Sequence, residues 1–314
     1  MTKALFTYPY DEERIKRVED LGYEVKVIER DDLNKEMDFS DIEVLVCNNP
    51  FDNIKLEKMD SLRFIQLISM GVERAPLGKI DDLNITLANA RGGFSPAIAE
   101  WIIAKVLEIY KKSRFYYRNQ LKKEWEKDRE IYELYDKTVL FLGTGSIAKE
   151  AARRVQAFEA GVFGVNTDGR AVEFFDDCYS NDELEEVLPV SDIVVVSLPL
   201  TDKTRGLLDH ELMKKMNDQS VLVNIARGEI IVEEDLIYLL KQDKFMGVAL
   251  DVFAEEPLPA ESPLWEMEDV IISPHVSYAS EYRFERVFKI VYENLRRYIK
   301  NEPLENVVDL EKGY

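Results

Sequence analysis

A glycine-rich turn constrains the fold of this chain more than any other feature of its sequence. The turn, Gly143-Thr144-Gly145-Ser146-Ile147-Ala148, follows the apolar run Val139–Leu142 and opens the helical stretch Ile147–Phe158. Glycines at these positions permit a tight bend and let the backbone approach a pyrophosphate, whose charge then meets the N-terminus of a helix. Alanine in the third place of the motif is a tolerated variant. The turn therefore predicts a strand, a turn and a helix that bind a dinucleotide.

Short apolar runs alternate with helical stretches along the whole chain, as they do in parallel α/β sheets. The first half contains five strand candidates, Ala4–Thr7, Val25–Ile28, Val44–Cys47, Phe64–Ile68 and Ile85–Ala88. The second half contains six, Val139–Leu142, Val162–Val165, Ile193–Ser197, Val221–Ile225, Val248–Leu250 and Val270–Ile272. Six parallel strands joined by crossover helices predict a doubly wound sheet for the second half.

Length and charge narrow the class of protein. A chain of 314 residues exceeds one ordinary core and predicts two domains. The formal net charge of −20 disfavours nucleic acid and anionic membrane surfaces as partners. No apolar stretch reaches the roughly 18 residues of a membrane span, and the N-terminus lacks a signal-peptide pattern, so we expect a cytoplasmic protein. Cys47 and Cys178 lack the close partners that a thiolate metal site needs, so no metal site is predicted.

A long helix is predicted to begin at Ser95 and Pro96, which form an N-cap and first-turn pair. Apolar residues occur around much of its circumference, which requires extensive burial. Two interpretations fit this pattern, a helix of the core and a helix of a subunit interface.

The residues that follow each strand are the candidate site, because ligands of open α/β sheets bind beyond the carboxyl ends of the strands. The second strand ends in Asn166-Thr167-Asp168-Gly169-Arg170, with Asn166 23 residues after the first glycine. An acid at about this distance usually accepts hydrogen bonds from the ribose of NAD. Here the position is neutral, and Thr167 and Arg170 are near enough to meet a 2′-phosphate, although Asp168 opposes it. This turn favours NADP over NAD.

Three further strand ends carry candidate chemistry. Leu198 and Pro199 follow the third strand and offer an apolar floor for a nicotinamide ring. Arg227 follows the fourth strand, where its guanidinium offers a rigid two-point fork for a carboxylate. His275 follows the sixth strand, and the interconversion of an alcohol and a ketone needs an acid/base of this kind. A carboxylate such as Glu256 stabilises the charged form of such an imidazole. The other histidine, His210, is predicted to be exposed in the first turn of a helix.

Taken together, these segments resemble the D-isomer-specific 2-hydroxyacid dehydrogenases. The matching runs are GTGSIA, SLPLTDKTRGLL, NIARGEII, ALDVFAEEPLP and SPHVSYAS, in the family's order, with SMGVERAP at 69–76. The resemblance covers essentially the whole chain. It implies an NAD(P)-dependent oxidoreductase that moves a hydride between the nicotinamide and a small 2-keto or 2-hydroxy acid. Arg227 would bind the substrate carboxylate and polarise its carbonyl, and His275 would be the acid/base with Glu256 as its partner.

The resemblance also implies further site residues. Asp251 would contact the nicotinamide carboxamide, and main-chain groups around Met70 and Gly71 would help to hold the substrate carboxylate. The dinucleotide would be lined by residues of five turns. The glycine-rich turn would contribute Gly143, Thr144, Gly145, Ser146 and Ile147, and the turn after the second strand would contribute Asn166, Thr167 and Arg170. Leu198, Pro199 and Thr204 would come from the loop after the third strand, Ile225 and Ala226 from the turn after the fourth, and Asp251 from the turn after the fifth.

The architecture that the resemblance implies has two domains. A Rossmann nucleotide domain would occupy residues 96–283, and its long helix would help to form a homodimer. A smaller, flavodoxin-like α/β substrate domain would be built from residues 1–95 and 284–314.

Two alternative functions are considered, a nucleotide-sensing corepressor and a formate dehydrogenase. Transcriptional corepressors that sense nucleotides share this fold and can keep the Arg227, Glu256 and His275 trio, so turnover of a keto acid is needed to separate them from an enzyme. Formate dehydrogenases carry glutamine in place of the Glu256 carboxylate, which speaks against that activity. The side chain of the substrate is not predicted from the sequence, although Phe51, Met70 and Phe94 are candidate pocket walls.

Overall fold

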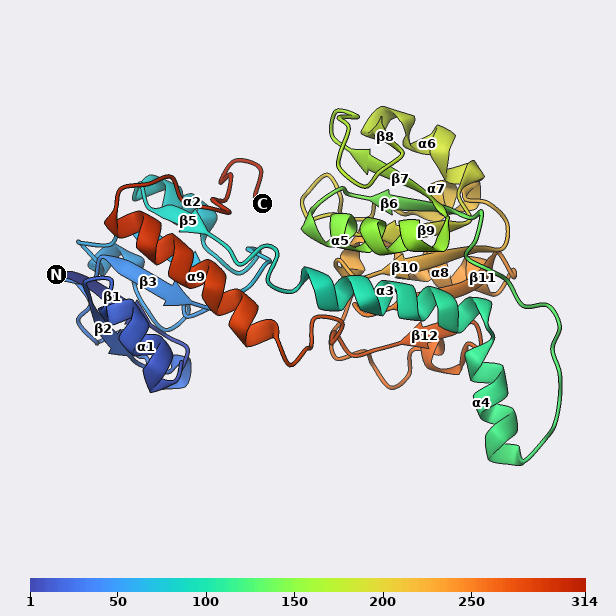
Figure 1. The fold of residues 1–314 in the computed structure, drawn as a ribbon, viewed down its shortest axis with the longest axis horizontal. Helices are drawn as coiled ribbons and strands as arrows, with labels where there is room; N and C mark the ends of the chain where they lie inside the picture. The colour runs from blue at the N-terminus through green and yellow to red at the C-terminus, as the bar shows by residue number, and fades with distance from the viewer. The chain divides into compact units, whose positions relative to one another are not determined.

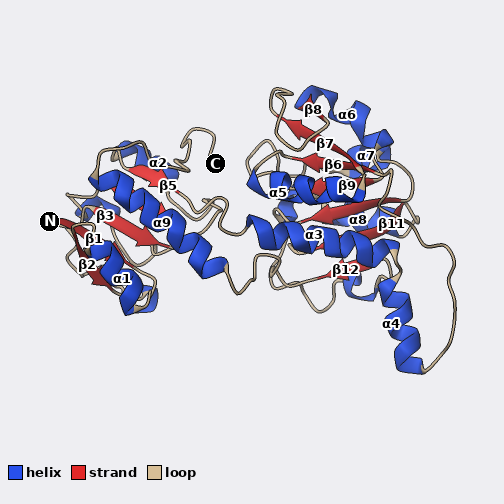
Figure 2. Cartoon of the chain, in the orientation of Figure 1, coloured by secondary structure: helices blue, strands red, loops and turns tan.

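The computed structural model describes residues 1–314 and divides them into two compact units. One unit comprises Met1–Phe94 and Ser280–Tyr314, and the other comprises Ser95–Ala279. In each unit, helices flank a central sheet (Figure 1, Figure 2). The limits differ from those expected from the sequence by one residue at Ser95 and by four at Ser280. The assignment of the units to substrate and dinucleotide stays a prediction.

The unit that contains both chain ends is built on a five-stranded parallel sheet of order β2-β1-β3-β4-β5. Its strands are β1 (Thr2–Phe6), β2 (Tyr23–Val27), β3 (Val44–Cys47), β4 (Phe64–Leu67) and β5 (Thr86–Ala88). Its helices are α1 (Glu12–Glu19), α2 (Leu77–Asp82) and α9 (Arg283–Ile299), with short 3-10 turns at Arg30–Asp32 and Leu56–Lys58. This strand order is the flavodoxin-like one.

Alternation along the strands explains how helices cover both faces of this sheet. Leu5 belongs to one buried cluster and its neighbours Ala4 and Phe6 to another, because successive side chains of a strand point to opposite faces. The helix α9, from the far end of the chain, adds Val287 and Phe288 to the cluster of Phe6. The two chain ends are therefore parts of one core.

The second unit is built on a seven-stranded parallel sheet of order β12-β11-β10-β9-β6-β7-β8. Its strands are β6 (Thr138–Leu142), β7 (Gly161–Asn166), β8 (Asp177–Ser180), β9 (Ile193–Val196), β10 (Ser220–Asn224), β11 (Phe245–Leu250) and β12 (Val270–Ile272). From β8 to β11 this is the Rossmann order 3-2-1-4-5-6, and β12 extends it by one strand. The doubly wound sheet expected from the sequence is confirmed.

Helices and short 3-10 turns connect the strands of this second sheet. The helices are α3 (Ser95–Tyr110), α4 (Ser113–Lys122), α5 (Ser146–Val155), α6 (Leu184–Val187), α7 (His210–Lys215) and α8 (Glu233–Leu240). The 3-10 turns are Gln156–Phe158, Asn181–Glu183, Leu188–Val190, Gly228–Ile230 and Pro263–Glu266. Among the helices, α3 and α5 lie side by side on the sheet (Figure 1).

The helix α4 differs from its neighbours, because it extends away from the sheet of its unit and is followed by a long segment without helix or strand (Figure 1). Lys112, in the left-handed region with φ +48°, separates it from α3. One face of α3 is buried in the core, including Ile98, Ile102 and Val106. This supports the core interpretation for that face of the predicted long helix.

Three expectations from the sequence are corrected. The strand β8 is absent from the prediction, because its run Asp177–Ser180 is short, begins and ends with polar residues, and pairs only with β7 as the outermost strand of the sheet. Ser95 is the first residue of α3 rather than its N-cap, and its hydroxyl donates to Oγ of Ser146 at 3.0 Å. His210 does begin a helix, but it is half-buried with its ring against Tyr238.

None of the helices combines the length and the apolar character that a membrane crossing requires.

Candidate active site

The predicted site residues of the second unit gather at one edge of its sheet. All seven strands are parallel, so the turns that follow them lie at the same edge, beyond the carboxyl ends. The glycine-rich turn follows β6, the Asn166 turn follows β7, and Leu198 follows β9. Arg227 follows β10, and Asp251 and His275 follow β11 and β12. The topology therefore brings together residues that lie far apart in the chain.

The glycine-rich turn has the shape that a pyrophosphate requires. Gly143 has φ +96°, and a Cβ there would lie 2.9 Å from the carbonyl oxygen of Ser197, so a larger residue would not fit. Gly145 precedes the first residue of α5, no side chain caps the helix, and a Cβ at Gly145 would meet nothing within 4 Å. The open space therefore lies where the N–H groups of the first turn of a ten-residue helix can receive an anion. These residues fit the phosphates of a dinucleotide.

Neighbouring residues fix this turn in place. The N–H of Gly143 donates to the carbonyl of Val165 at 2.9 Å, which ties the turn to the end of β7. A Cβ at Gly164 would lie 2.5 Å from the methyl group of Thr144, so Thr144 packs closely against β7. The side chain of Ile147 is buried at the start of α5.

The Asn166 turn is organised by the amide of Asn166 itself. Asn166 is buried, its Oδ1 accepts from the N–H of Arg170 at 3.1 Å, and its Nδ2 donates to the carbonyl of Arg170 at 2.9 Å. The exposed side chain of Arg170 pairs with Asp168 at 2.6 Å. That ion pair lowers the pKa of the Asp168 carboxyl through the hydrogen bond with Arg170. Thr167 is exposed in the same turn.

The loop after β9 is held by Thr204. Its hydroxyl donates to the carbonyl of Pro199 at 2.7 Å and accepts from the N–H of Thr201 at 2.8 Å. Leu198 and Pro199 are half-buried, and Leu198 packs against the main core cluster. Thr204 therefore shapes the loop that carries the predicted apolar floor.

The turn that carries Arg227 depends on Asn224, the first residue of the run NIARGEII, to which the sequence alone assigns no role. Asn224 is 1% exposed, its Nδ2 donates to the carbonyl of Arg227 at 3.0 Å, and its Oδ1 accepts from the N–H of Ala226 at 3.0 Å. Ile225 and Ala226 are buried within the turn. The Arg227 side chain is half-buried, and its Nη1 donates to the carbonyl of Ala226 at 2.6 Å.

Gly228 lets this turn pack against the loop after β11. A Cβ at Gly228 would lie 1.9 Å from the carbonyl carbon of Phe253, a distance that no side chain permits. A buried glycine after a strand is a weak signal in a sequence, and only the packing shows why this residue is needed.

Asp251 joins two loops of the site. It is fully buried, and its carboxylate accepts from the hydroxyl of Ser273 and from the N–H groups of Val276 and Ser277, the latter two at 2.9 Å. Its carbonyl accepts from the N–H of His275 at 2.8 Å, and its own N–H donates to the carbonyl of Asn224 at 3.0 Å. The carboxylate thus holds the His275 loop. The carboxamide contact that the family resemblance implies stays a prediction.

His275 and Glu256 form the predicted pair. Nδ1 of His275 lies 2.9 Å from Oε2 of Glu256, and since a carboxylate only accepts, the ring donates from Nδ1. The other oxygen, Oε1, accepts from the N–H of Phe253 at 3.1 Å. The side chains of His275 and Glu256 are 42% and 38% exposed, so a ligand can reach the pair. The bond from Phe253 holds the Glu256 carboxylate in place. Nε2 is the ring nitrogen that does not face Glu256.

Met70 and Gly71 belong to the other unit, where they follow β4. Nδ2 of Asn89 donates to the carbonyl of Met70 at 2.9 Å, and the hydroxyl of Ser69 donates to the carbonyl of Gly71 at 3.0 Å. These bonds fix the loop within its own unit. The role of the two residues toward the substrate carboxylate stays a prediction.

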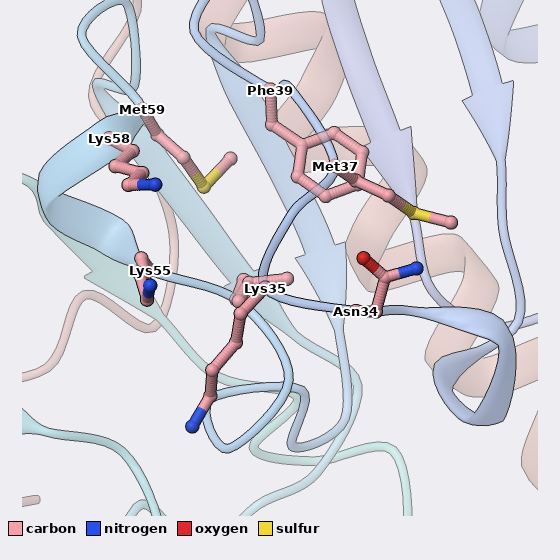
Figure 3. Close-up of a pocket in the computed structure, with 8 residues that line it drawn as sticks. Asn34, Lys35, Met37, Phe39, Lys55, Lys58 and Met59 are labelled. Carbon is pink, nitrogen blue, oxygen red and sulfur yellow. The ribbon is translucent and has the colours of Figure 1, made fainter.

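A small hollow of the same unit contains none of the predicted site residues (Figure 3). Phe39 and Met59 form buried parts of its wall, and the lysines at its rim are exposed, Lys35, Lys55 and Lys58. No chemistry is assigned to it. The structure contains no group of three or more His, Cys, Asp or Glu side chains that could hold a metal ion. Cys47 is buried, and burial raises the pKa of its thiol.

The doubly wound sheet and its glycine-rich turn define a class, the dinucleotide-binding α/β proteins. Comparison with known proteins defines the family. The family model described as the D-isomer specific 2-hydroxyacid dehydrogenase, NAD binding domain, matches residues 103–277, more than half of the chain. The chain belongs to this family and is an NAD(P)-dependent enzyme of the 2-hydroxyacid dehydrogenase type.

Two solved structures and one further relative agree with this assignment. A probable 2-hydroxyacid dehydrogenase from Rhizobium etli, in complex with NADP, HEPES and L(+)-tartaric acid, is 28% identical with a TM-score of 0.85, and all of both chains is covered. An NADPH-dependent glyoxylate/hydroxypyruvate reductase from Sinorhizobium meliloti, in complex with NADP and sulfate, is 28% identical with a TM-score of 0.84 and the same coverage. D-3-phosphoglycerate dehydrogenase of Methanocaldococcus jannaschii is 29% identical over 321 residues, and the match covers 99% of this chain but only 60% of that protein.

Proposed function

We propose that the protein reduces a small 2-keto acid of the glyoxylate or hydroxypyruvate type to the D-2-hydroxy acid, with NADPH moderately preferred over NADH. The observation that carries this proposal is the 2.9 Å contact of His275 with Glu256, on a loop that Asp251 and Asn224 connect to the Arg227 turn. An acid/base and a carboxylate-binding cation held by one bonded network suit the reduction of a keto acid.

Each residue has a role in this chemistry. When it is bound, the reduced nicotinamide ring supplies the hydride that the carbonyl carbon accepts. Arg227 binds the substrate carboxylate and polarises the carbonyl. His275 donates the proton from Nε2 to the carbonyl oxygen as charge develops there. Glu256 holds the ring by Nδ1 and stabilises the imidazolium before the proton is transferred.

The substrate class is supported by the relatives and by the charge of the chain. The Sinorhizobium meliloti protein is a glyoxylate/hydroxypyruvate reductase, and the Rhizobium etli structure holds a hydroxy acid, tartaric acid. The formal net charge of −20 repels anionic substrates in general, so a local cation such as Arg227 is needed to capture one.

The preference for NADPH is supported by two observations. Both solved structures named above contain NADP. In this chain the turn after β7 carries an exposed arginine, Arg170, whose guanidinium suits a 2′-phosphate. The preference is moderate because Asp168 lies beside that arginine.

A homodimer is the second part of the proposal. Tyr117 and Leu121 on α4 and Trp125 just beyond it are 62%, 67% and 92% exposed. Large apolar side chains gathered on a projecting segment are typical of an interface, and a second copy of the chain would cover them.

The experiment that tests the proposal is a matrix of initial rates. Glyoxylate, hydroxypyruvate, pyruvate and branched keto acids are each reduced with NADPH and with NADH, and the D configuration is checked for every product that has a stereocentre. We expect the highest kcat/KM with glyoxylate or hydroxypyruvate and NADPH. Binding of both dinucleotides without turnover of any keto acid would contradict the proposal and favour the nucleotide-sensing corepressor function instead.

A further inference from the structure

We propose that Asp168 competes with the 2′-phosphate of NADP for Arg170, and that Asn166 is the residue that holds Arg170 in place for either partner. The inference rests on the proposed binding of a dinucleotide at this edge of the sheet. It changes the role of Asn166 from a residue that faces the ribose to one that positions its neighbour.

The hydrogen bonds of Asn166 carry the second half of the inference. One amide satisfies both backbone groups of a single residue, since Oδ1 accepts from the N–H of Arg170 at 3.1 Å and Nδ2 donates to its carbonyl at 2.9 Å. Asn166 is 6% exposed, so little of it is left to contact a ligand. An aspartate of the same shape could accept but could not donate, and its charge would face the Arg170 carbonyl.

The turn also requires a glycine between Asp168 and Arg170. Gly169 has φ +70°, which a side chain would strain, and a Cβ there would lie 3.1 Å from the backbone nitrogen of Ser180 on β8. The turn therefore packs against β8, the strand that is not predicted from the sequence. The Asn166 amide bonds to both the N–H and the carbonyl of Arg170, so the guanidinium moves from one anion to another only by rotation about its side-chain torsions.

The partner it has in this structure is Asp168. Nη1 of Arg170 lies 2.6 Å from Oδ1 of Asp168, and both side chains are 61% exposed. An exposed ion pair of this kind contributes little to stability, so it can be exchanged for a better anion at small cost. A phosphate is such an anion, because it has more charge than a carboxylate and oxygens that match the guanidinium fork.

The position of the turn makes the exchange relevant to the dinucleotide. The Gly143–Val165 hydrogen bond places the glycine-rich turn beside the end of β7, next to Asn166. A dinucleotide with its pyrophosphate at α5 has its adenosine ribose at the end of the next strand. Asp168 thus lowers the affinity for NADP in two ways, because it pairs with Arg170 and because its charge repels the 2′-phosphate. With NAD the pair stays intact.

The test uses two small probes that differ only in the 2′-phosphate, adenosine 2′,5′-bisphosphate and 5′-AMP, with affinities measured by isothermal titration calorimetry. We expect Asp168→Asn to bind the bisphosphate roughly tenfold more tightly and 5′-AMP unchanged, since a charge-assisted contact is worth about one to two decades. Arg170→Ala should weaken the bisphosphate alone, and Asp168→Asn should give no gain in the Arg170→Ala background. Asp136→Asn is the control for net charge. Asp136 is an exposed acid that precedes β6, so it lies at the amino ends of the strands, away from the site at their carboxyl ends.

The outcomes separate this inference from the proposed function. An unchanged bisphosphate affinity in Asp168→Asn, or an equal gain in Asp136→Asn, overturns the competition. Tighter binding of 5′-AMP by Asn166→Asp overturns the positioning role of Asn166, for which we expect weaker bisphosphate binding and no gain for 5′-AMP. Failure of wild-type protein to bind either probe or NADH would instead contradict the dinucleotide site itself.

Discussion

The N–H of Asp251 donates to the carbonyl oxygen of Asn224 at 3.0 Å, and this bond joins the loop of His275, the proposed acid/base, to the turn of Arg227, the proposed carboxylate ligand. On one side, the Asn224 amide bonds to the backbone of Ala226 and Arg227. On the other, the Asp251 carboxylate accepts from backbone N–H groups of the His275 loop. Hydrogen bonds of two buried side chains therefore connect the backbone of the Arg227 turn with that of the His275 loop.

Asn224 is expected to act on the substrate through the position of Arg227. Asn224→Ala removes both amide bonds to the turn, so we expect the KM for the keto acid and the Kd of oxamate, an unreactive keto-acid analogue, to rise about tenfold, the cost of roughly 1.4 kcal/mol. The Kd of NADPH should stay within about twofold. Asn294→Ala is the matched control, because Asn294 is equally buried and bonded within the other unit. Equal effects of the two substitutions on oxamate binding would show that Asn224 acts only through stability.

Glu256 is expected to contribute its charge to the chemical step. Glu256→Gln keeps the size of the side chain but loses the charge that stabilises the imidazolium, so we expect kcat for keto-acid reduction to fall roughly 10²-fold or more. Stopped-flow measurement of the first turnover isolates the chemical step, and a fluorescence titration reports the affinity for NADPH, which should be unchanged. A first turnover at the wild-type rate would remove Glu256 from the mechanism.

Glu293 on α9 is expected to make stability depend on pH in the acid range. Hydrogen bonds from Arg296, the larger effect, and from Arg297 lower the pKa of Glu293 from 4.5 to about 2. A carboxyl whose pKa is depressed in the folded state contributes stability that is present above its unfolded pKa and is lost as the pH falls through the folded value. Between pH 4.5 and 2 we therefore expect the Tm of Glu293→Gln to fall less than that of the wild type. Thermal melts of both proteins and of Glu19→Gln, at an exposed acid on α1, measure this. Parallel acid limbs for wild type and Glu293→Gln would refute it.

The apolar side chains of α4 and the segment after it are expected to govern assembly. Trp125→Asp places a charge on the most exposed large apolar side chain of this segment, and burying that charge in a homodimer interface is costly. We expect sedimentation velocity to show a dimer for the wild type and a shift toward monomer for the variant at micromolar concentration. Trp265→Asp, at a 48% exposed tryptophan elsewhere on the unit, should leave the dimer intact. A monomeric wild-type protein would contradict the proposed homodimer.

The elements that can be predicted from the sequence are those whose burial appears in the pattern of residues. The run Ile193–Val196 of β9 is apolar throughout and fully buried, as expected of a central strand covered on both faces. The edge strand β8 lacks that pattern, because Asp177–Ser180 is partly exposed and polar at both ends. The sheet is thus predictable wherever burial on both faces dictates the composition.

The site divides in the same way. Residues whose chemistry is distinctive, such as His275 and Arg227, can be proposed as site residues from their type and their place after a strand. Asn224 cannot, because its role lies in hydrogen bonds to a turn whose conformation the sequence does not reveal. The same holds for Asn166, where an amide at the end of a strand indicates a ligand contact, while its bonds in the structure go to Arg170.

The most direct test of the central claim is the kcat of His275→Gln. Glutamine keeps a polar side chain but cannot act as an acid near neutral pH, so we predict a fall in kcat for keto-acid reduction of roughly 10²–10⁴-fold. The Kd of NADPH, measured by fluorescence on the same protein, should change by less than about twofold, because the proposed role is in proton transfer. Turnover near the wild-type rate, with the fold intact by circular dichroism, would contradict the assignment of His275 as the acid/base.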